Sequence, residues 1–321
     1  MKLRHISLTT DGGGPAIATA AARVLFVALF CLAPSLHAKV LFETYSAYHH
    51  IEVVESRGIR TLSFDGSRET QMSVTNPLAG HFEYTEFFHA PWIWNRNLDR
   101  VLMIGLGGGS TQRSFQHYYT NTHIDSVEID PAVVKVARKY FGVTETPNHK
   151  IHVADGRLFL LRSSQTYDAI IMDAYTTTRY GSTLPPHLVT KEFFEMARDH
   201  LTTNGVLAYN VIGQTGGSQA DIVGAVYRTL QEVFPQVYLF PAGTSRNVVL
   251  IATRDPGRQD YSRVQKIGAE LVDSKVVTLP DFKTRLRSFQ SSPPPAAANS
   301  PILTDDRTAL EGLMRHIPGA R

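Results

Sequence analysis

Residues 101–130 constrain the fold more than any other stretch of the chain. An apolar run, VLMI, is followed by a cluster of glycines, a helix-like segment and a second run that ends on Glu128. This order is typical of a strand, a tight turn, a helix and a second strand. Glycines let such a turn approach a ligand closely, and an acid about 20 residues further on is placed to accept hydrogen bonds from ribose hydroxyls. The stretch predicts a nucleoside site containing Gly105, Gly107, Gly108 and Glu128.

The glycine pattern does not match a dinucleotide site. The dinucleotide fingerprint is G-x-G-x-x-G, and counting from Gly105 its third glycine position is occupied by Ser110. The pattern therefore favours a nucleoside that presents no pyrophosphate over NAD.

The region before this stretch has a different period. Residues 39–95 alternate apolar and polar side chains, with turn signals at the Arg-Gly and Asp-Gly dipeptides of residues 57–58 and 65–66. We expect hairpins here that form a small antiparallel β domain over residues 39–97. Residues 83–94 are rich in aromatic side chains and are expected to be helical as far as Pro91.

From residue 101 onward, apolar runs alternate with helix-like segments, which indicates a parallel sheet covered by helices on both faces. We therefore predict a doubly wound, Rossmann-like α/β domain over residues 98–255. Asp130 and Pro131 are expected to be the N-cap and first residue of a helix. Residues 256–321 are predicted to form a C-terminal extension, in which the Pro, Ala and Ser residues of 288–300 make a linker without a core-forming pattern.

The N-terminus has the features of a targeting segment. Residues 24–36 are an apolar run preceded by Arg23, and Leu-His-Ala follows with the small-residue spacing of a cleavage site. We expect a signal peptide over residues 1–38 that exports the protein to the periplasm or the medium, leaving no stable membrane span. The alternative is an uncleaved membrane anchor starting near Ala16. Cys31 is the only cysteine, so a chain cut after Ala38 has no cysteine nucleophile and no thiolate metal site.

Charge gives little support for nucleic acid as a partner. The formal net charge is +3, and no run of Lys and Arg and no basic patch with interleaved aromatic residues stands out. We expect a small molecule as the partner.

Acids also end two further strands of the predicted sheet. Asp155, followed by Gly156, ends the third strand, and Asp173 ends the fourth, which is almost entirely apolar. Ligands of an open parallel sheet bind outside the carboxyl ends of its strands, so we expect these acids to lie in one site with Glu128. We interpret Asp173 as the catalytic base, because it opens a loop over residues 174–187 that is long enough to fold over a ligand.

The histidines do not predict a metal centre. His49 and His50 are neighbours on an expected strand, so their side chains point to opposite faces. No pair of histidines has a spacing that forms a zinc-like cluster with the acids. We therefore expect no metal.

Several motifs together resemble the spermidine synthase family, the polyamine aminopropyltransferases, and in particular its divergent bacterial branch. The resemblance covers residues 42–253, with a further piece at 302–311. Its motifs are E-x-x-S-x-Y at 43–48, FDG at 64–66, Tyr84, VLMIGLGGG, VEIDPAVVKVARKYF, ADGR, YDAIIMDAY, LPPHLVTKEFF and ILTDDRTALE.

The resemblance implies a fold of the S-adenosylmethionine methyltransferase and spermidine synthase type, a homodimer and no metal. It implies decarboxylated S-adenosylmethionine as the donor of an aminopropyl group and an amine as the acceptor. By the same resemblance Glu128 holds the ribose and Asp155 the adenine amino group, while Asp173 takes a proton from the attacking amine that Tyr84 helps to orient. His49 stands where the family has a cofactor-contacting glutamine.

Two family carboxylates are missing from this sequence. Gly108 stands where the glycine loop of the family carries an acid, and Thr176 stands where a second acid follows the catalytic one. Each lost charge-assisted hydrogen bond to an amine costs about 1.5 to 3 kcal/mol of binding free energy. The departures suggest an altered acceptor, and they leave two alternatives open: a methyltransferase that uses ordinary S-adenosylmethionine, and a non-catalytic, exported nucleoside-binding protein.

Overall fold

The computed structural model describes residues 38–178, 181–217, 220–307, 310 and 313. The chain divides into two units, Met1–Ala38 and Lys39–Arg321, and the expected signal peptide lies outside the described residues except for Ala38. Within the described part, no helix has the length and apolar character needed to cross a bilayer.

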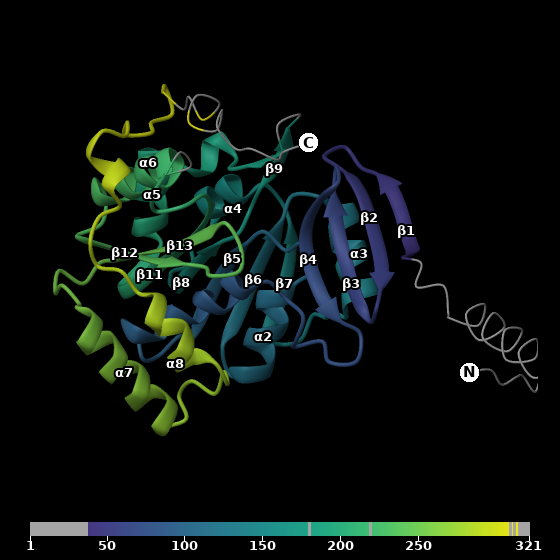
Figure 1. The fold of residues 1–321 in the computed structure, drawn as a ribbon, viewed down its shortest axis with the longest axis horizontal. Coiled ribbons are helices and arrows are strands. Elements are labelled where there is room, and N and C mark those ends of the chain that lie inside the picture. The colour runs from purple at the N-terminus through teal and green to yellow at the C-terminus, as the bar shows by residue number, and fades with distance from the viewer. Residues whose placement is uncertain (1–37, 179–180, 218–219, 308–309, 311–312, 314–321) are drawn as a thin grey trace, which may run out of the picture. The chain divides into compact units, whose positions relative to one another are not determined.

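The N-terminal part of the second unit is an antiparallel sheet of four strands in the order β1-β2-β3-β4 (Figure 1). Its two predicted tight turns have left-handed backbone conformations, with φ of 52° and 74° at Arg57 and Gly58 and of 51° and 85° at Asp65 and Gly66. Two consecutive positive φ values are typical of type I′ hairpins. The strands are β1 (Lys39–Tyr45), β2 (His50–Ser56), β3 (Ile59–Phe64) and β4 (Ser67–Ser73).

The larger part is built on a seven-stranded sheet in the order β12-β13-β11-β8-β5-β6-β7. The strands from β11 to β7 are parallel to one another, and β13 is antiparallel to both of its neighbours. This arrangement confirms the predicted α/β fold class with a preceding antiparallel sheet. The strands are β5 (Arg100–Ile104), β6 (His123–Glu128), β7 (His149–Val153), β8 (Tyr167–Met172), β11 (Leu201–Ile212), β12 (Gln236–Pro241) and β13 (Asn247–Thr253).

Helices cover both faces of this sheet. In Figure 1, α4, α5 and α6 lie on one side, and α2, α7 and α8 lie on the other. The helix at the predicted Asp130 cap begins as expected, because the Asp130 carboxylate accepts a hydrogen bond from the Ala132 amide and Pro131 is the first residue. The helices are α2 (Ser110–Tyr118), α3 (Pro131–Phe141), α4 (Gly156–Arg162), α5 (Lys191–Asp199), α6 (Ala220–Gln231), α7 (Tyr261–Asp273) and α8 (Phe282–Arg285), with 3₁₀ helices η1 (Glu83–Ile93), η2 (Pro186–Leu188), η3 (Leu286–Ser288) and η4 (Pro295–Ala298).

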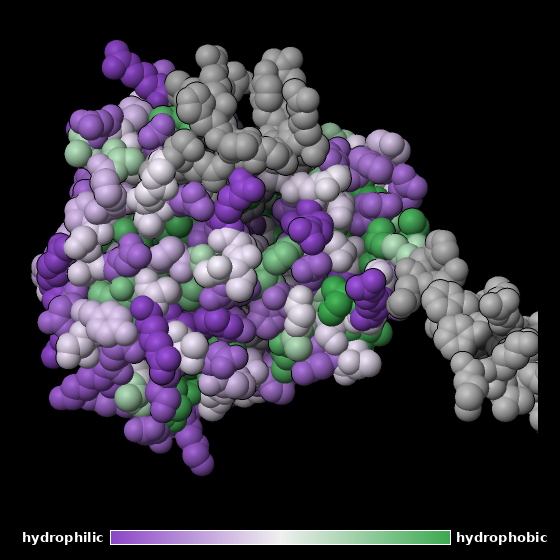
Figure 2. All heavy atoms as spheres, in the orientation of Figure 1, coloured by the Kyte–Doolittle hydropathy of each residue, from purple (hydrophilic) through white to green (hydrophobic). Residues whose placement is uncertain are grey.

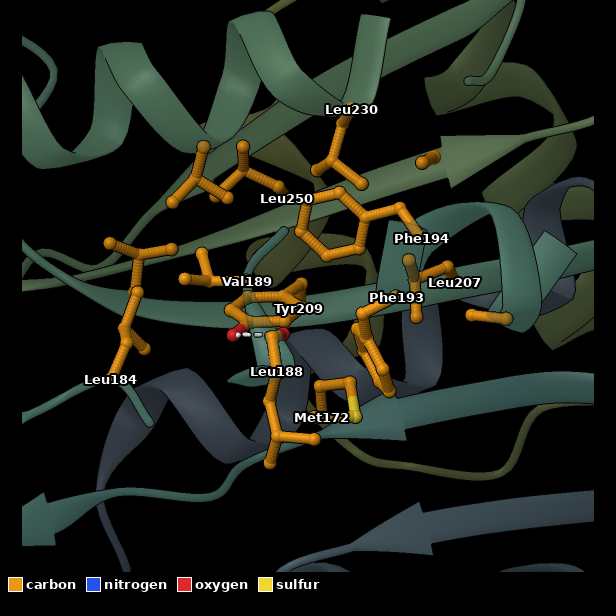
Figure 3. Close-up of a cluster of buried hydrophobic side chains, with 14 of the residues drawn as sticks. Met172, Leu184, Leu188, Val189, Phe193, Phe194, Leu207, Tyr209, Leu230 and Leu250 are labelled. Atoms are coloured by element: carbon orange, nitrogen blue, oxygen red, sulfur yellow. Dashed lines mark hydrogen bonds between the residues drawn. The ribbon is translucent and has the colours of Figure 1, made fainter. Parts of the chain in front are cut away.

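The core under α5 and α6 fixes the strand and loop that carry the predicted base. Met172, the last residue of β8, packs there with Leu184 and Leu188 from the far end of the following loop (Figure 3). The Tyr209 hydroxyl donates a hydrogen bond of 2.9 Å to the Leu188 carbonyl. Both ends of the loop that begins at Asp173 are therefore anchored in the interior.

Apolar side chains of α3 face the small antiparallel sheet. Val133, Val136 and Phe141 form one buried cluster with Ile51 and Leu62 of β2 and β3. The two sheets are thereby joined through a helix that directly follows β6.

The outer face shown in Figure 2 is mostly hydrophilic, because most of the large apolar side chains are buried in the core.

The aromatic segment before the large sheet differs from its predicted form. It is a 3₁₀ helix, η1, that continues through Pro91 to Ile93. Every residue from Tyr84 to Ile93 is buried, so burial on all sides, rather than one apolar face, accounts for its aromatic composition.

The predicted linker at residues 288–300 is a packed segment, and this corrects the expectation from its composition. Gln290 pairs with Leu239 of the edge strand β12 through two backbone hydrogen bonds, and Ala297 of η4 is buried against α6. A Cβ atom at Gly224 in α6 would come within 2.9 Å of the Ala297 nitrogen. The small residues of the segment and this glycine allow the backbones to approach closely.

Candidate active site

A cavity of about 380 Å³ lies at the carboxyl ends of the parallel strands. The antiparallel sheet forms its opposite wall, and the loop after β8 borders it. The sequence-predicted residues that line the cavity are Gly105, Gly107, Glu128, Asp155, Gly156, Asp173, Tyr84 and His49. The structure therefore brings together all of the predicted site residues except Gly108.

The first glycine of the loop, Gly105, lies so close to the backbone of Asp173 that no larger residue fits there. Gly105 has a φ of 98°, and a Cβ atom there would lie 2.2 Å from the carbonyl oxygen of Asp173. Gly107 also has a positive φ, of 51°. These conformations are readily adopted by glycine and strained for other residues, which explains the glycines at both positions.

Gly108, unlike the other predicted site residues, does not line the cavity. Its amide donates a hydrogen bond of 2.9 Å to the Thr70 hydroxyl, and a Cβ atom there would lie 2.6 Å from Thr70 Cγ2. The side chain that an acid would carry at this position meets the antiparallel sheet, because Thr70 fills that space. Gly108 is accordingly not among the residues that line the cavity.

Glu128 is held by the backbone at the end of β6. Its two carboxylate oxygens accept hydrogen bonds of 3.0 Å from the amides of Leu106 and Asp130. Burial raises the pKa of Glu128, although these amides favour the charged form. The carboxylate is therefore fixed beside the glycine loop, where it can accept further hydrogen bonds.

Asp155 caps the helix that follows β7. One oxygen accepts a hydrogen bond of 2.9 Å from the Leu158 amide, and the other lies 2.7 Å from Nε2 of His187. His187 comes from the end of the loop after β8 and also lines the cavity. Gly156 lets α4 approach the sheet, because a Cβ atom there would lie 2.4 Å from Ile104 Cγ2.

Asp173 receives two side-chain hydrogen bonds. Asn210 Nδ2 donates to Oδ1 at 2.9 Å, and the Tyr84 hydroxyl donates to Oδ2 at 3.2 Å. Burial raises the pKa of Asp173 to about 7, although both hydrogen bonds favour the charged form. Burial and the Asp173 charge raise the pKa of Tyr84, which therefore stays a donor. A carboxylate with this pKa is suited to accept a proton near neutral pH.

Sequence reasoning missed Asn210. This residue lies in β11 within the apolar run VLAYNVI, and its own Oδ1 accepts a hydrogen bond of 3.1 Å from Asn247. Asn210 is a single polar residue within an apolar run, and this could have identified it from the sequence. A buried amide needs a hydrogen-bond partner, so such a residue is a candidate for contact with a site carboxylate.

The opposite wall of the cavity comes from the antiparallel sheet. The buried ring of His49 stacks on Phe64, with centroids 4.5 Å apart, and its Nδ1 lies 3.4 Å from the carboxylate of Asp65. Glu69, which sequence reasoning also missed, lines the cavity from β4. The Ser182 hydroxyl donates a hydrogen bond of 2.9 Å to Glu69.

The loop after β8 contains a short hairpin, β9 (Thr176–Thr178) paired with β10 (Gly181–Thr183). Ser182 in this hairpin contacts the antiparallel sheet, and the Tyr175 hydroxyl donates a hydrogen bond of 2.9 Å to the Asn210 carbonyl. The described part of the loop thus contacts both walls of the cavity, and its role as a lid stays a prediction.

The charges that line the cavity are mostly of one sign. No Lys or Arg is among the described lining residues, whereas four carboxylates are: Glu69, Glu128, Asp155 and Asp173. Among the residues that the structure describes, no group of three or more His, Cys, Asp or Glu side chains is arranged to hold a metal ion. The cavity is electrostatically suited to a cationic ligand.

Fold and cavity together define a Rossmann-like α/β protein with an acidic site at the carboxyl edge of its sheet. Comparison with known proteins narrows this class. The spermine/spermidine synthase domain matches residues 81–245. A polyamine aminopropyltransferase of Vibrio vulnificus is 33% identical over 251 residues, which cover 74% of this chain and 81% of that protein.

Two further similarities differ in extent. The spermidine synthase structure of Thermotoga maritima matches with a TM-score of 0.56 at 26% identity, covering 78% of this chain and 88% of that one. An eEF1A lysine and N-terminal methyltransferase of Xenopus laevis is 30% identical over 55% of this chain but only 26% of its own length.

The chain belongs to the spermine/spermidine synthase family, and it is a transferase. The roles of the individual site residues stay predictions, as do the homodimer and the domain boundaries.

Proposed function

We propose that the protein transfers an aminopropyl group from decarboxylated S-adenosylmethionine to an amine. The observation that carries this proposal is the pairing of a base-like carboxylate, Asp173, with a cavity whose described lining has four acids and no Lys or Arg. Both the sulfonium donor and an amine acceptor are cations, so this lining favours them. The family and the Vibrio vulnificus relative support the same reaction class.

The donor half of the cavity is formed by the edge of the parallel sheet. Glu128 is placed to accept hydrogen bonds from the ribose hydroxyls, beside the open backbone of Gly105 and Gly107. Asp155 is placed to accept a hydrogen bond from the adenine amino group once its pairing with His187 loosens. These contacts bind and orient the nucleoside and leave the sulfonium near Asp173.

The transfer step needs one base. The nitrogen lone pair of the acceptor attacks the methylene carbon bonded to the sulfonium sulfur. A carbon–nitrogen bond forms, the carbon–sulfur bond breaks, and its electron pair goes to sulfur, which leaves as the neutral thioether methylthioadenosine. The Asp173 carboxylate accepts the proton that the nitrogen loses. Tyr84 and Asn210 hold that carboxylate in position.

Methyl transfer from ordinary S-adenosylmethionine is the second candidate. The similarity to the methyltransferase of Xenopus laevis favours it. The donor's extra carboxylate argues against it, because the described lining has no Lys or Arg to pair with that group and Glu69 and Asp173 repel it.

Export is a separate proposal. It rests on residues 1–38 and their resemblance to a signal peptide, and it keeps open the non-catalytic, nucleoside-binding alternative. N-terminal sequencing of the protein from the producing cell is expected to start at Lys39. An intact Met1 contradicts cleavage and favours a membrane anchor.

A turnover assay tests the reaction. The purified protein is incubated with 1,4-diaminobutane and either decarboxylated or ordinary S-adenosylmethionine, and products are identified by mass spectrometry. Methylthioadenosine and an aminopropylated diamine are expected with the decarboxylated donor only. S-adenosylhomocysteine with the ordinary donor instead indicates methyl transfer, and nucleoside binding without any product supports the non-catalytic alternative.

A further inference from the structure

Glu69 enters the cavity through a β-bulge. In the pairing of β3 with β4, Leu62 lies opposite Thr70 and Ser63 lies opposite Arg68, so Glu69 is the extra residue. Neighbouring residues of a regular strand point to opposite faces, whereas a bulge changes the direction of a side chain. Here Glu69 and Thr70 both line the cavity. The local fold thus brings a carboxylate to the site from a wall that otherwise contributes aromatic and hydroxyl groups.

The bulge places Glu69 within electrostatic reach of the proposed base. Burial raises the pKa of Glu69, and the Glu69 charge in turn contributes to the raised pKa of Asp173. Two carboxylates that share a cavity repel each other, and a cation bound between them or beside one of them relieves this repulsion. The Ser182 hydroxyl holds Glu69 in place without neutralising its charge.

The other carboxylates of the cavity have different partners. Glu128 accepts two backbone hydrogen bonds, and Asp155 caps α4 and contacts His187. No Lys or Arg of the described lining is available to pair with Glu69. A positive charge from the substrate is therefore the group that Glu69 is suited to bind.

We propose that Glu69 is the specificity-determining residue that binds the second ammonium group of a diamine acceptor. This inference rests on the proposed aminopropyl transfer. The attacking amine must be neutral when it reacts, because a protonated nitrogen has no lone pair. A carboxylate that remains paired through the reaction consequently needs another amino group that keeps its charge. Glu69 supplies, from β4, a negative charge to a cavity in which Thr176 stands at the position of a family carboxylate.

Glu69→Gln removes the charge and keeps an oxygen that can accept from Ser182. Steady-state kinetics are compared with 1,4-diaminobutane and 1-aminobutane as acceptors. We expect the KM for the diamine to rise at least tenfold, the KM for the donor to stay unchanged, and the preference for the diamine over the monoamine to fall about tenfold. The control is Glu52→Gln on β2, which changes the same charge outside the cavity lining and is expected to have no effect.

Three results overturn the inference: a rise in the donor KM alone, an unchanged preference for the diamine, or an equal loss in the control. Glu69→Asp is a second variant that keeps the charge and is expected to retain a preference for the diamine. If Glu69→Gln and Glu69→Asp behave alike, charge is not what Glu69 contributes, and the inference is wrong.

A binding measurement separates this inference from the proposed reaction. 1,4-Diaminobutane is titrated into the wild type and Glu69→Gln in the presence of methylthioadenosine, with heat as the readout. Absence of turnover in the wild type contradicts the proposed reaction alone. Tighter diamine binding by the wild type, by at least tenfold, supports the role of Glu69 in either case, and equal or absent binding contradicts it.

Discussion

The two walls of the cavity are built differently. On the parallel-sheet wall, Glu128 is the last residue of β6 and Asp155 follows β7, and both accept hydrogen bonds from backbone amides. On the antiparallel-sheet wall, His49 is held by ring stacking on Phe64, and Glu69 is held by the hydroxyl group of Ser182 from the loop after β8. Backbone contacts depend little on side-chain identity, whereas side-chain contacts change with single substitutions.

This difference suggests that one wall binds the donor and the other selects the acceptor. The parallel-sheet wall is suited to a constant donor nucleoside, because its geometry comes with the fold. The antiparallel-sheet wall is suited to select the acceptor. Its carboxylate, Glu69, is separate from the strand ends that hold the donor, so a substitution at Glu69 alters the charge near the acceptor alone. Substitutions on the first wall are expected to affect donor binding, and those on the second to affect the acceptor. Asp173 lies where the two tasks meet.

The largest effect is expected at this meeting point. Asp173→Asn removes the proposed base and keeps the side-chain size, so kcat is expected to fall by about 10²- to 10⁴-fold. Methylthioadenosine affinity, measured by calorimetry, is expected to change little. Asp199→Asn on the exposed end of α5 is the matched control. Full turnover by a folded Asp173→Asn variant contradicts the assigned role.

The pH profile sharpens the same assignment. Asp173 acts as a base only when ionised, and its pKa is about 7, so kcat/KM is expected to rise tenfold per pH unit up to about pH 7 and then to lose this dependence on Asp173. The hydrogen bond from Tyr84 lowers the pKa of Asp173, so Tyr84→Phe is expected to move this inflection to higher pH. The free acceptor amine also titrates, but its pKa does not depend on Tyr84, so only an inflection that comes from Asp173 is expected to move. An inflection that stays in place contradicts Asp173 as its origin.

A change on the parallel-sheet wall tests whether donor binding is separate. Glu128→Gln removes the charge from the proposed ribose contacts, which costs about 1.5 to 3 kcal/mol, or a tenfold to hundredfold loss of methylthioadenosine affinity. Calorimetric titration measures this loss. The KM for the acceptor is expected to stay unchanged at saturating donor. An effect on the acceptor alone reverses the assignment of the two walls.

The smallest effect is expected on stability, from the contact between Gly108 of the glycine loop and Thr70 of the antiparallel sheet. Gly108→Ala places a methyl group against Thr70 Cγ2, and such overpacking costs about 1 to 3 kcal/mol of unfolding free energy. Thr70→Ser removes Cγ2 and keeps the hydroxyl that accepts from the Gly108 amide. The double variant is expected to recover part of the stability in denaturant unfolding. Additive losses in the double variant exclude this contact as the cause.

The parallel-sheet wall was predictable from sequence because its rule is local. A residue that follows an apolar parallel strand lies at the sheet's carboxyl edge, so Glu128, Asp155 and Asp173 were brought to one cavity by their positions alone. The glycine loop was predictable for the same reason, except at Gly108. Its direction depends on Thr70, which is far away in the sequence.

The antiparallel-sheet wall was harder to predict. Glu69 enters the cavity only because β4 has one residue more than β3 at that point, and strand register is not visible in a period-two pattern. The C-terminal segment of residues 288–300 was misjudged because its fit against α6 depends on Gly224, not on a hydrophobic pattern of its own. In both cases long-range packing decides the outcome.

The acidic lining is expected to make the cavity select a nucleoside donor without a carboxylate. Calorimetric titration of the purified protein with decarboxylated and ordinary S-adenosylmethionine tests it most directly, because the two ligands differ only by the carboxylate. We expect the decarboxylated form to bind at least tenfold more tightly. Equal affinity, or tighter binding of the ordinary form, contradicts it.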